Sequence, residues 1–177
     1  MGAMVALTSL VACRQASDST SGELDYSHVV DVSLYGWGPA DTLFFPVEVT
    51  WPAHVRTPLR QGLPYDVHCS VRMEGGYRLS DVPMCLIVQQ TDTLEDGHTH
   101  VIHNLLRQEI APVVRDSLGL AFGSSWGSLI DYQTQLDGLT LQFDSVGTYR
   151  MLLIPRTGEL PAISGISAIG LHLYRRP

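Results

Sequence analysis

From Val29 onward the chain alternates apolar and polar residues with a period of two, which is typical of β-strands that bury one face. The clearest stretch covers residues 65–73. Its predicted inward residues are Val67, Cys69 and Val71, and its predicted outward residues are His68 and Arg72. Further strands are predicted at residues 29–34, 45–51, 82–90, 98–106, 139–143, 148–154 and 166–174.

Short polar and glycine-rich connections between these segments predict an antiparallel arrangement. Gly75 and Gly76 follow the strand at 65–73 and permit the positive φ of a tight turn, so residues 65–73 and 82–90 are predicted to form a hairpin. Residues 128–136 offer a competing helical period. The whole pattern predicts an all-β fold, an antiparallel β-sandwich of the immunoglobulin-like or jelly-roll-like kind, over residues 28–177.

The composition agrees with one folded domain and excludes a nucleic-acid binder. The 177 residues are 45% apolar and 16% charged, enough for one sizeable core. All eleven Lys and Arg positions are arginine, against eighteen acidic residues, which gives a formal net charge of -7. No basic stripe is present to bind phosphates, and no stretch beyond residue 13 approaches the ~20 apolar residues of a membrane span.

The N-terminus has a different character. Residues 4–12 are uncharged and have the length of a signal-peptide core, and Leu10-Val11-Ala12-Cys13 resembles a bacterial lipobox. We therefore expect a lipoprotein signal peptide at residues 1–12, an acylated Cys13, and a flexible tether over residues 13–27. No Arg or Lys precedes Met4, unlike most export signals, and the alternative interpretation is a buried segment of the domain.

Cys69 and Cys85 are the cysteines left after Cys13, and an exported domain can pair such residues. In the predicted hairpin, Cys69 lies opposite position 82 rather than Cys85, which favours two buried free thiols. The pairing stays open at this point.

One motif suggests nucleophilic catalysis. Gly123-Ser124-Ser125-Trp126-Gly127 matches G-x-S-x-G, with Asp131, Asp137, Asp144 and His172 following in the order of an α/β-hydrolase. A nucleophile elbow needs a parallel strand before it and a helix after it, and the chain does not alternate strands with helices. We interpret the motif as a glycine-rich connection, with a serine hydrolase using Ser125 as the lower alternative.

A second group of residues suggests metal binding. His98 and His100 share one face of a predicted strand, a spacing that zinc sites use, with His103 on the opposite face. We interpret these histidines as a solvated strand face. The sequence contains no glycosidase-like carboxylate pair, no P-loop and no dinucleotide motif. We therefore predict a protein without enzymatic activity, metal or cofactor.

The order of several short motifs resembles the gliding-motility-associated lipoprotein GldH family of Bacteroidota over about residues 29–174. In the first half the matching residues are Trp37, Phe44-Phe45, Tyr65, Val71-Arg72 and Tyr77. In the second half they are Leu118-Gly119-Leu120, Gly123 to Gly127, Leu141-Gln142-Phe143, Gly147-Thr148-Tyr149, Leu160-Pro161-Ala162-Ile163 and Ile169-Gly170-Leu171. Arg156 is the one counterpart of a Met-Arg pair in the family, and the strand at 98–103 has no counterpart.

The resemblance implies a non-enzymatic cell-envelope lipoprotein, an accessory or scaffold component of a gliding-motility-type machinery. It implies anchoring at Cys13 and partners among other envelope proteins; Arg72, Tyr77, Trp126 and Arg156 are the candidate contact residues. The outer membrane is the expected location. Its periplasmic face is favoured, because Asp18 alone only weakly resembles the acidic signal for surface export. The alternative is a carbohydrate- or peptide-binding sandwich with a platform built from Trp37, Trp51 and Trp126.

Overall fold

The computed structural model describes residues 22–50, 62–93 and 99–176, which form β-strands joined by loops and turns. No helix occurs in this part of the chain, and so none that is long and apolar enough to cross a membrane. The strands are β1 (Glu23–Asp31), β2 (Leu43–Val49), β3 (Leu63–Glu74), β4 (Met84–Thr93), β5 (Thr99–Ile110), β6 (Ser124–Trp126), β7 (Leu129–Phe143), β8 (Gly147–Pro155) and β9 (Ile166–Arg175).

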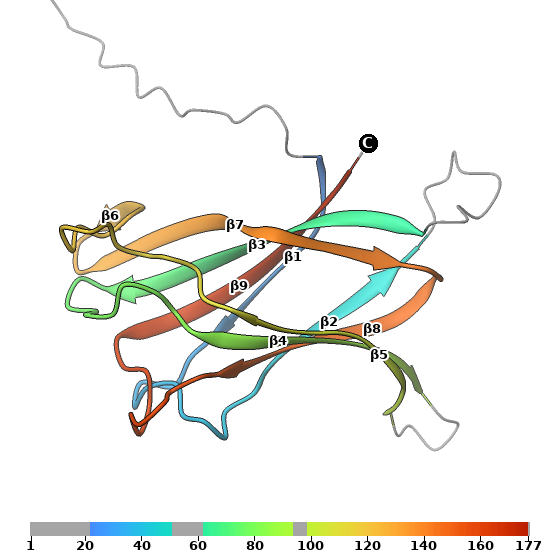
Figure 1. Ribbon diagram of the computed structural model, residues 1–177, viewed down its shortest axis with the longest axis horizontal. Coiled ribbons are helices and arrows are strands. Elements are labelled where there is room, and N and C mark those ends of the chain that lie inside the picture. The colour runs from blue at the N-terminus through green and yellow to red at the C-terminus, as the bar shows by residue number, and fades with distance from the viewer. Residues whose placement is uncertain (1–21, 51–61, 94–98, 177) are drawn as a thin grey trace, which may run out of the picture.

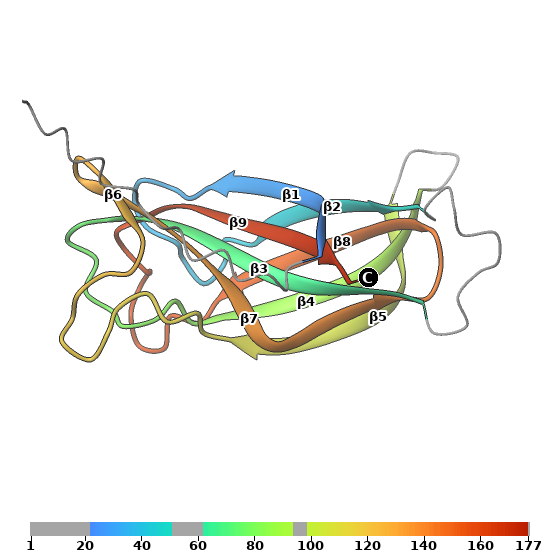
Figure 2. The ribbon, with the colours of Figure 1, turned by 90° about the horizontal axis from the view of Figure 1, so that it is seen from above.

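The strands build two stacked antiparallel sheets, as Figure 1 shows. The first sheet has the order β1-β9-β3-β7-β6, and the second has the order β2-β8-β4-β5. In Figure 2 the strands of both sheets succeed one another from β1 and β2 at one side to β7 and β5 at the other. The predicted antiparallel β-sandwich is therefore confirmed.

The pairing of the strands identifies the sandwich as a jelly roll. When the short β6 is set aside, the first strand pairs with the last, β1 with β9, and the second pairs with the last but one, β2 with β8. The third pairs with the sixth, β3 with β7, and the fourth with the fifth, β4 with β5. One long antiparallel hairpin rolled into two sheets gives this nesting of pairs, which is the jelly-roll topology.

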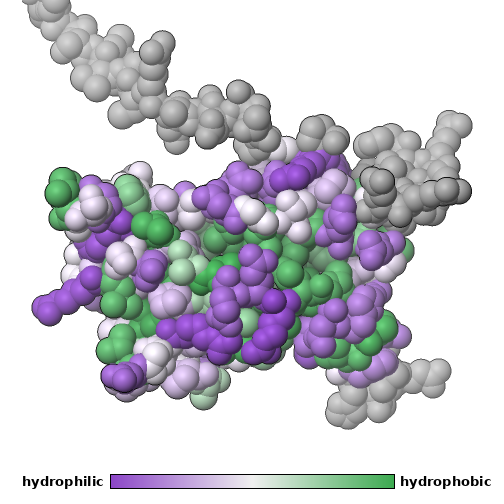
Figure 3. Space-filling model, in the orientation of Figure 1, coloured by the Kyte–Doolittle hydropathy of each residue, from purple (hydrophilic) through white to green (hydrophobic). Residues whose placement is uncertain are grey.

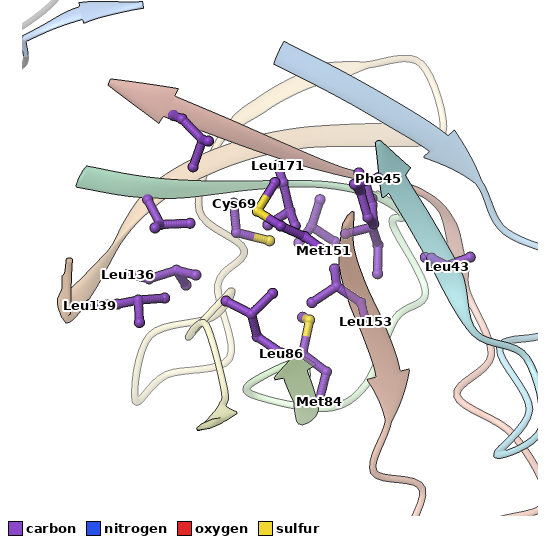
Figure 4. Packing of buried hydrophobic residues seen from close by; sticks show 14 of the residues in the cluster. Leu43, Phe45, Cys69, Met84, Leu86, Leu136, Leu139, Met151, Leu153 and Leu171 are labelled. Atoms are coloured by element: carbon purple, nitrogen blue, oxygen red, sulfur yellow. The ribbon is translucent and has the colours of Figure 1, made fainter. Parts of the chain in front are cut away.

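The core lies between the sheets and is filled from alternate positions of each strand. Val67, Cys69 and Val71 of β3 are buried, and His68 and Arg72 point to the other face, which confirms the predicted faces of this strand. Figure 4 shows the packing: Cys69 and Leu171 from the first sheet point toward Met151 and Leu86 from the second. The period of two thus places one continuous apolar layer between the two sheets.

The predicted hairpin between residues 65–73 and 82–90 is wrong. β3 pairs with β7 and β9, whereas β4 belongs to the other sheet and pairs with β5 and β8. Gly75 and Gly76 do not adopt positive φ, and Tyr77 and Val82 bury their side chains as the connection crosses the end of the core. The alternation within a strand is the same whichever strand lies beside it, so it could not exclude this crossing.

Two further predictions are corrected. The helical interpretation of residues 128–136 is wrong, because β7 runs straight through them. The first strand begins at Glu23 and ends at Asp31, so residues 23–27 belong to the sheet rather than to the tether. The short β6 was not predicted. Residues 1–21, Trp51 and His98 lie outside the described residues.

Cys69 and Cys85 do not form a disulfide. Cys69 lies in the core between the sheets, whereas Cys85 alternates with the core residues of β4 and packs with Ile87 and Leu152 on the outer side of the second sheet. Burial raises the pKa of the Cys69 thiol to about 12 and also raises that of Cys85, where Glu109 adds to the effect. Both thiols therefore stay protonated and act as small apolar side chains.

Candidate functional site

The structure does not bring the predicted contact residues together. Arg72 projects from the outer face of the first sheet, where its Nε and Nη2 bond the two carboxylate oxygens of Asp131 at 2.7 and 3.2 Å. Arg156 follows β8, and its Nε bonds the Glu109 carboxylate at 2.8 Å on the outer side of the second sheet. The two arginines thus lie on opposite outer faces of the sandwich, Arg72 on the first sheet and Arg156 on the second. Cys13 lies outside the described residues.

The two aromatic candidates differ sharply in exposure. Tyr77 is only 3% exposed, and its hydroxyl donates to the backbone oxygen of Asp81 at 2.7 Å. Its ring packs in the core and offers no surface to a partner. Trp126 in β6 is 73% exposed and remains a candidate contact.

The glycines of the G-x-S-x-G motif have a structural explanation in the β6–β7 hairpin. A Cβ at Gly123, where φ is +103°, would lie 2.2 Å from the backbone oxygen of Asp131. Gly127, with φ at +64°, is the first residue of the two-residue turn between Trp126 and Leu129, the position that a type II′ turn reserves for glycine. The motif thus lies in an antiparallel hairpin and not in the strand-to-helix turn of a hydrolase.

Ser125 and His172 are also far from a catalytic pair. Ser125 is exposed on β6, opposite Ile130. The imidazole of His172 lies on β9 and bonds two other hydroxyls, Ser27 Oγ through Nδ1 at 2.8 Å and Ser70 Oγ through Nε2 at 2.9 Å. The geometry therefore gives the serine-hydrolase alternative no nucleophile–base hydrogen bond.

The metal-binding and tryptophan-platform alternatives gain no support from the described residues. His100 and His103 are exposed along β5, and no group of three potential ligands that could hold a metal ion occurs in the described part of the chain. Trp37 is fully buried, and its indole Nε1 donates to the backbone oxygen of Asp41 at 2.7 Å. Trp37 therefore cannot join Trp126 in a platform.

One end of the sandwich carries most of the exposed apolar side chains found within residues 22–50, 62–93 and 99–176. The connections β1–β2, β3–β4, β5–β7 and β8–β9 all lie at this end, which we call the loop end and which is on the left in Figure 1. Among the residues that the structure describes, thirteen large apolar residues are exposed, and eight of them lie in these connections: Leu34, Tyr35, Val113, Leu118, Leu120, Phe122, Trp126 and Leu160. Figure 3 shows hydrophobic residues among polar ones at this end. Exposed apolar side chains gathered in one region are typical of interaction surfaces.

Backbone hydrogen bonds tie the loop-end connections to one another. Trp37 and Ile163 form a two-way bridge between the first and the last connection. The amide of Val82 donates to Pro112 O, which ties the β3–β4 connection to the β5–β7 connection. Arg115 bonds both Gly119 O and Gly75 O, at 2.7 and 3.2 Å. These bonds hold the exposed apolar side chains on a prearranged surface, which reduces the entropy that a partner must overcome on binding.

The outer face of the first sheet has the opposite character, and we call it the polar face. Its residues lie side by side on β1, β9, β3 and β7: Ser27, Val29, Gly170, His172, Tyr174, His68, Ser70, Arg72, Asp131 and Gln133. The His68 ring packs against the Tyr174 ring with centroids 4.4 Å apart and planes inclined at 52°, and Gln133 Nε2 donates to the Tyr174 hydroxyl at 3.2 Å. Sequence reasoning named His172 only as a strand residue and as the last member of a possible hydrolase order, and it did not connect His172 with Ser70, because their contact depends on how β3 and β9 pair.

Burial keeps the two histidines of the polar face neutral. Burial lowers the pKa of His172, and the neighbouring His68 lowers it further. Burial also lowers the pKa of His68, although Asp66 opposes this change. Both rings therefore act as neutral hydrogen-bonding groups near pH 7.

This burial predicts that acid destabilises the fold through His172. Between the lowered pKa of folded His172 and about pH 6.5, the unfolded chain binds a proton that the folded protein lacks. The free energy of unfolding should therefore decrease as the pH is lowered through this window, by at most about 1.4 kcal/mol per pH unit. Urea unfolding at pH 7.5, 6.5 and 5.5 measures the slope. His172→Gln should reduce it and His103→Gln on β5 should not; equal slopes in all three proteins would contradict the prediction.

The chain was compared with known proteins. No protein-family model matches it, and no curated protein sequence matches it. The resemblance to the GldH family therefore stays a prediction.

Proposed function

We propose that the protein is a non-enzymatic lipoprotein of the cell envelope, anchored through Cys13, that acts as an accessory or scaffold component through contacts made by its loop end. The observation that carries this proposal is the concentration of exposed apolar side chains on the loop end, which is held together by backbone bridges. The expectation of a gliding-motility-type machinery, and of the outer membrane as the location, comes from the resemblance to the GldH family and belongs to the same proposal.

The arrangement of the ends supports an anchored scaffold. Glu23, the first residue of β1, pairs with Arg175 near the C-terminus, and β1 then runs nine residues toward the loop end. At about 3.3 Å per residue, this strand separates the start of the domain from the loop end by about 30 Å. A tether that joins Cys13 to Glu23 would therefore leave the loop end facing away from the membrane and free to contact other proteins.

The anchor is tested by mass spectrometry of the N-terminal peptide from the native host. We expect the mature chain to begin at Cys13, with acyl chains on the thiol and on the new amino group. Each buried methylene contributes about 0.8 kcal/mol, so two or three chains anchor a protein stably where one is marginal. Cys13→Ser should move the protein from the membrane to the soluble fraction. An unmodified peptide that begins before Cys13, recovered from the soluble fraction, would contradict the proposed anchor.

A further inference from the structure

A recess of about 260 Å³ lies on the polar face, and none of the residues that line it belongs to the loop-end connections. Its lining comes from four strands of the first sheet: Val29 of β1; Ala168 and His172 of β9; Ser70, Val71 and Arg72 of β3; Asp131, Tyr132 and Gln133 of β7. Its volume is below the roughly 300–1,000 Å³ of pockets for drug-sized ligands, so it fits one small ring rather than a large cofactor.

A part-buried hydrogen-bond network fixes the Ser70 hydroxyl at this recess. His172 is 8% exposed, and its two ring nitrogens bond Ser27 Oγ and Ser70 Oγ at 2.8 and 2.9 Å. Gly170 makes the network possible, because a Cβ there would lie only 2.3 Å from Ser70 Oγ and 3.2 Å from His172 Nε2. Because Gly170 has no side chain, the Ser70 hydroxyl can lie over β9 and reach the imidazole of His172.

The charges at the recess cancel. The Arg72 guanidinium uses Nε and Nη2 to bond the Asp131 carboxylate, and the neutral His172 adds no charge. The pair leaves Nη1 of Arg72 as a donor and a lone pair on each Asp131 oxygen as an acceptor. Gln133 donates to the Tyr174 hydroxyl and keeps its carbonyl oxygen as an acceptor. The recess therefore offers fixed donors and acceptors with no net charge.

We infer that this recess binds a neutral saccharide unit. A sugar ring carries several hydroxyls that both donate and accept, which matches the mixed and preoriented groups of the recess. An anion would have to compete with Asp131 for Arg72, and a cation would have to compete with Arg72 for Asp131. Val29, 53% exposed at the rim, offers an apolar contact to the C–H groups of a ring. Because the recess opens on a sheet surface, a longer glycan can extend beyond it.

Two sources can supply this chemistry, an envelope glycan of N-acetylated amino sugars or an external polysaccharide of neutral hexoses. We would titrate the detergent-solubilised full-length protein calorimetrically with tri-N-acetylchitotriose, and separately with cellotriose and mannotriose. We expect the protein to bind either tri-N-acetylchitotriose or the neutral hexose trisaccharides. Binding of the first would identify an envelope glycan as the source, and binding of the second an external polysaccharide. Gln133→Ala should weaken that binding by about tenfold, as expected for the loss of a hydrogen bond of about 1.4 kcal/mol.

Gln142→Ala is the matched control, because Gln142 is an exposed residue of β7 that does not line the recess. This control should bind like the wild type, and so should a variant with substitutions at the loop end, since the inference does not depend on the proposed protein contacts. Thermal unfolding of Gln133→Ala would show that the fold is intact. Failure of all three trisaccharides to bind, or equal affinities of the wild type and Gln133→Ala, would overturn the inference.

Discussion

Val71→Asp should unfold the domain or lower its free energy of unfolding by at least about 4 kcal/mol. Val71 is 1% exposed and lies in β3, which is hydrogen-bonded to β7 on one side and to β9 on the other. A carboxylate at this position would be buried in the core without a partner, and β3 cannot turn it to solvent without losing its register with both neighbours. Urea unfolding followed by circular dichroism measures the loss.

Gln142→Asp is the control for this substitution. It introduces the same carboxylate into β7 of the same sheet, at an exposed position that faces away from the core. Its free energy of unfolding should stay within about 0.5 kcal/mol of the wild type. Equal losses for the two variants would show that β3 does not bury the face that carries Val71.

The faces of the strands could be predicted from the sequence, but their partners could not. The alternation at residues 65–73 correctly separated Val71 from Arg72, because the side chains of a strand alternate whatever lies beside it. The hairpin with residues 82–90 failed because the same alternation suits a strand in either sheet. The choice between an immunoglobulin-like and a jelly-roll-like sandwich depends on pairings such as β1 with β9, which are about 145 residues apart in the chain, as Ser27 and His172 show.

The positions of the candidate contact residues could not be predicted for the same reason. Trp126 and Tyr77 are both aromatic residues beside turns, and nothing local distinguishes the 73% exposure of one from the 3% exposure of the other. The partners of Arg72 and Arg156, Asp131 and Glu109, come from strands remote in sequence. The polar face and the loop end exist only once the strands are assembled. The sequence shows that Leu118 and Leu120 are apolar, but it does not show whether their side chains are buried in the core or exposed.

A loop-end variant with Leu118→Ser, Leu120→Ser and Trp126→Ser should lose the proposed protein contacts while it keeps its fold. The three side chains are 83%, 64% and 73% exposed, so their replacement removes little buried area from the domain. Tryptophan is prominent among the residues that dominate interfaces, where its truncation costs about 2 kcal/mol or more and weakens binding at least about 30-fold. The melting temperature should therefore stay close to that of the wild type.

Two controls belong with this variant. Val146→Ser removes an exposed apolar side chain between β7 and β8, at the end of the sandwich opposite to the loop end, and should leave the contacts intact. Ser125→Ala removes the hydroxyl of the G-x-S-x-G motif on the same hairpin as Trp126 and should also leave them intact. A true nucleophile would lose its reactivity with that hydroxyl and would be labelled by a serine-reactive phosphonate in the wild type.

The most direct measurement is quantitative co-purification from detergent-solubilised envelopes of a deletion strain that expresses each protein at the same level. We expect a defined set of envelope proteins to co-purify with the wild type, Val146→Ser and Ser125→Ala, and the recovery of that set to fall at least about tenfold with the loop-end variant. Recovery of the same proteins in the same amounts with the loop-end variant would contradict the proposed contact surface. Phosphonate labelling of Ser125, together with loss of function in Ser125→Ala, would contradict the scaffold proposal and favour the serine-hydrolase alternative.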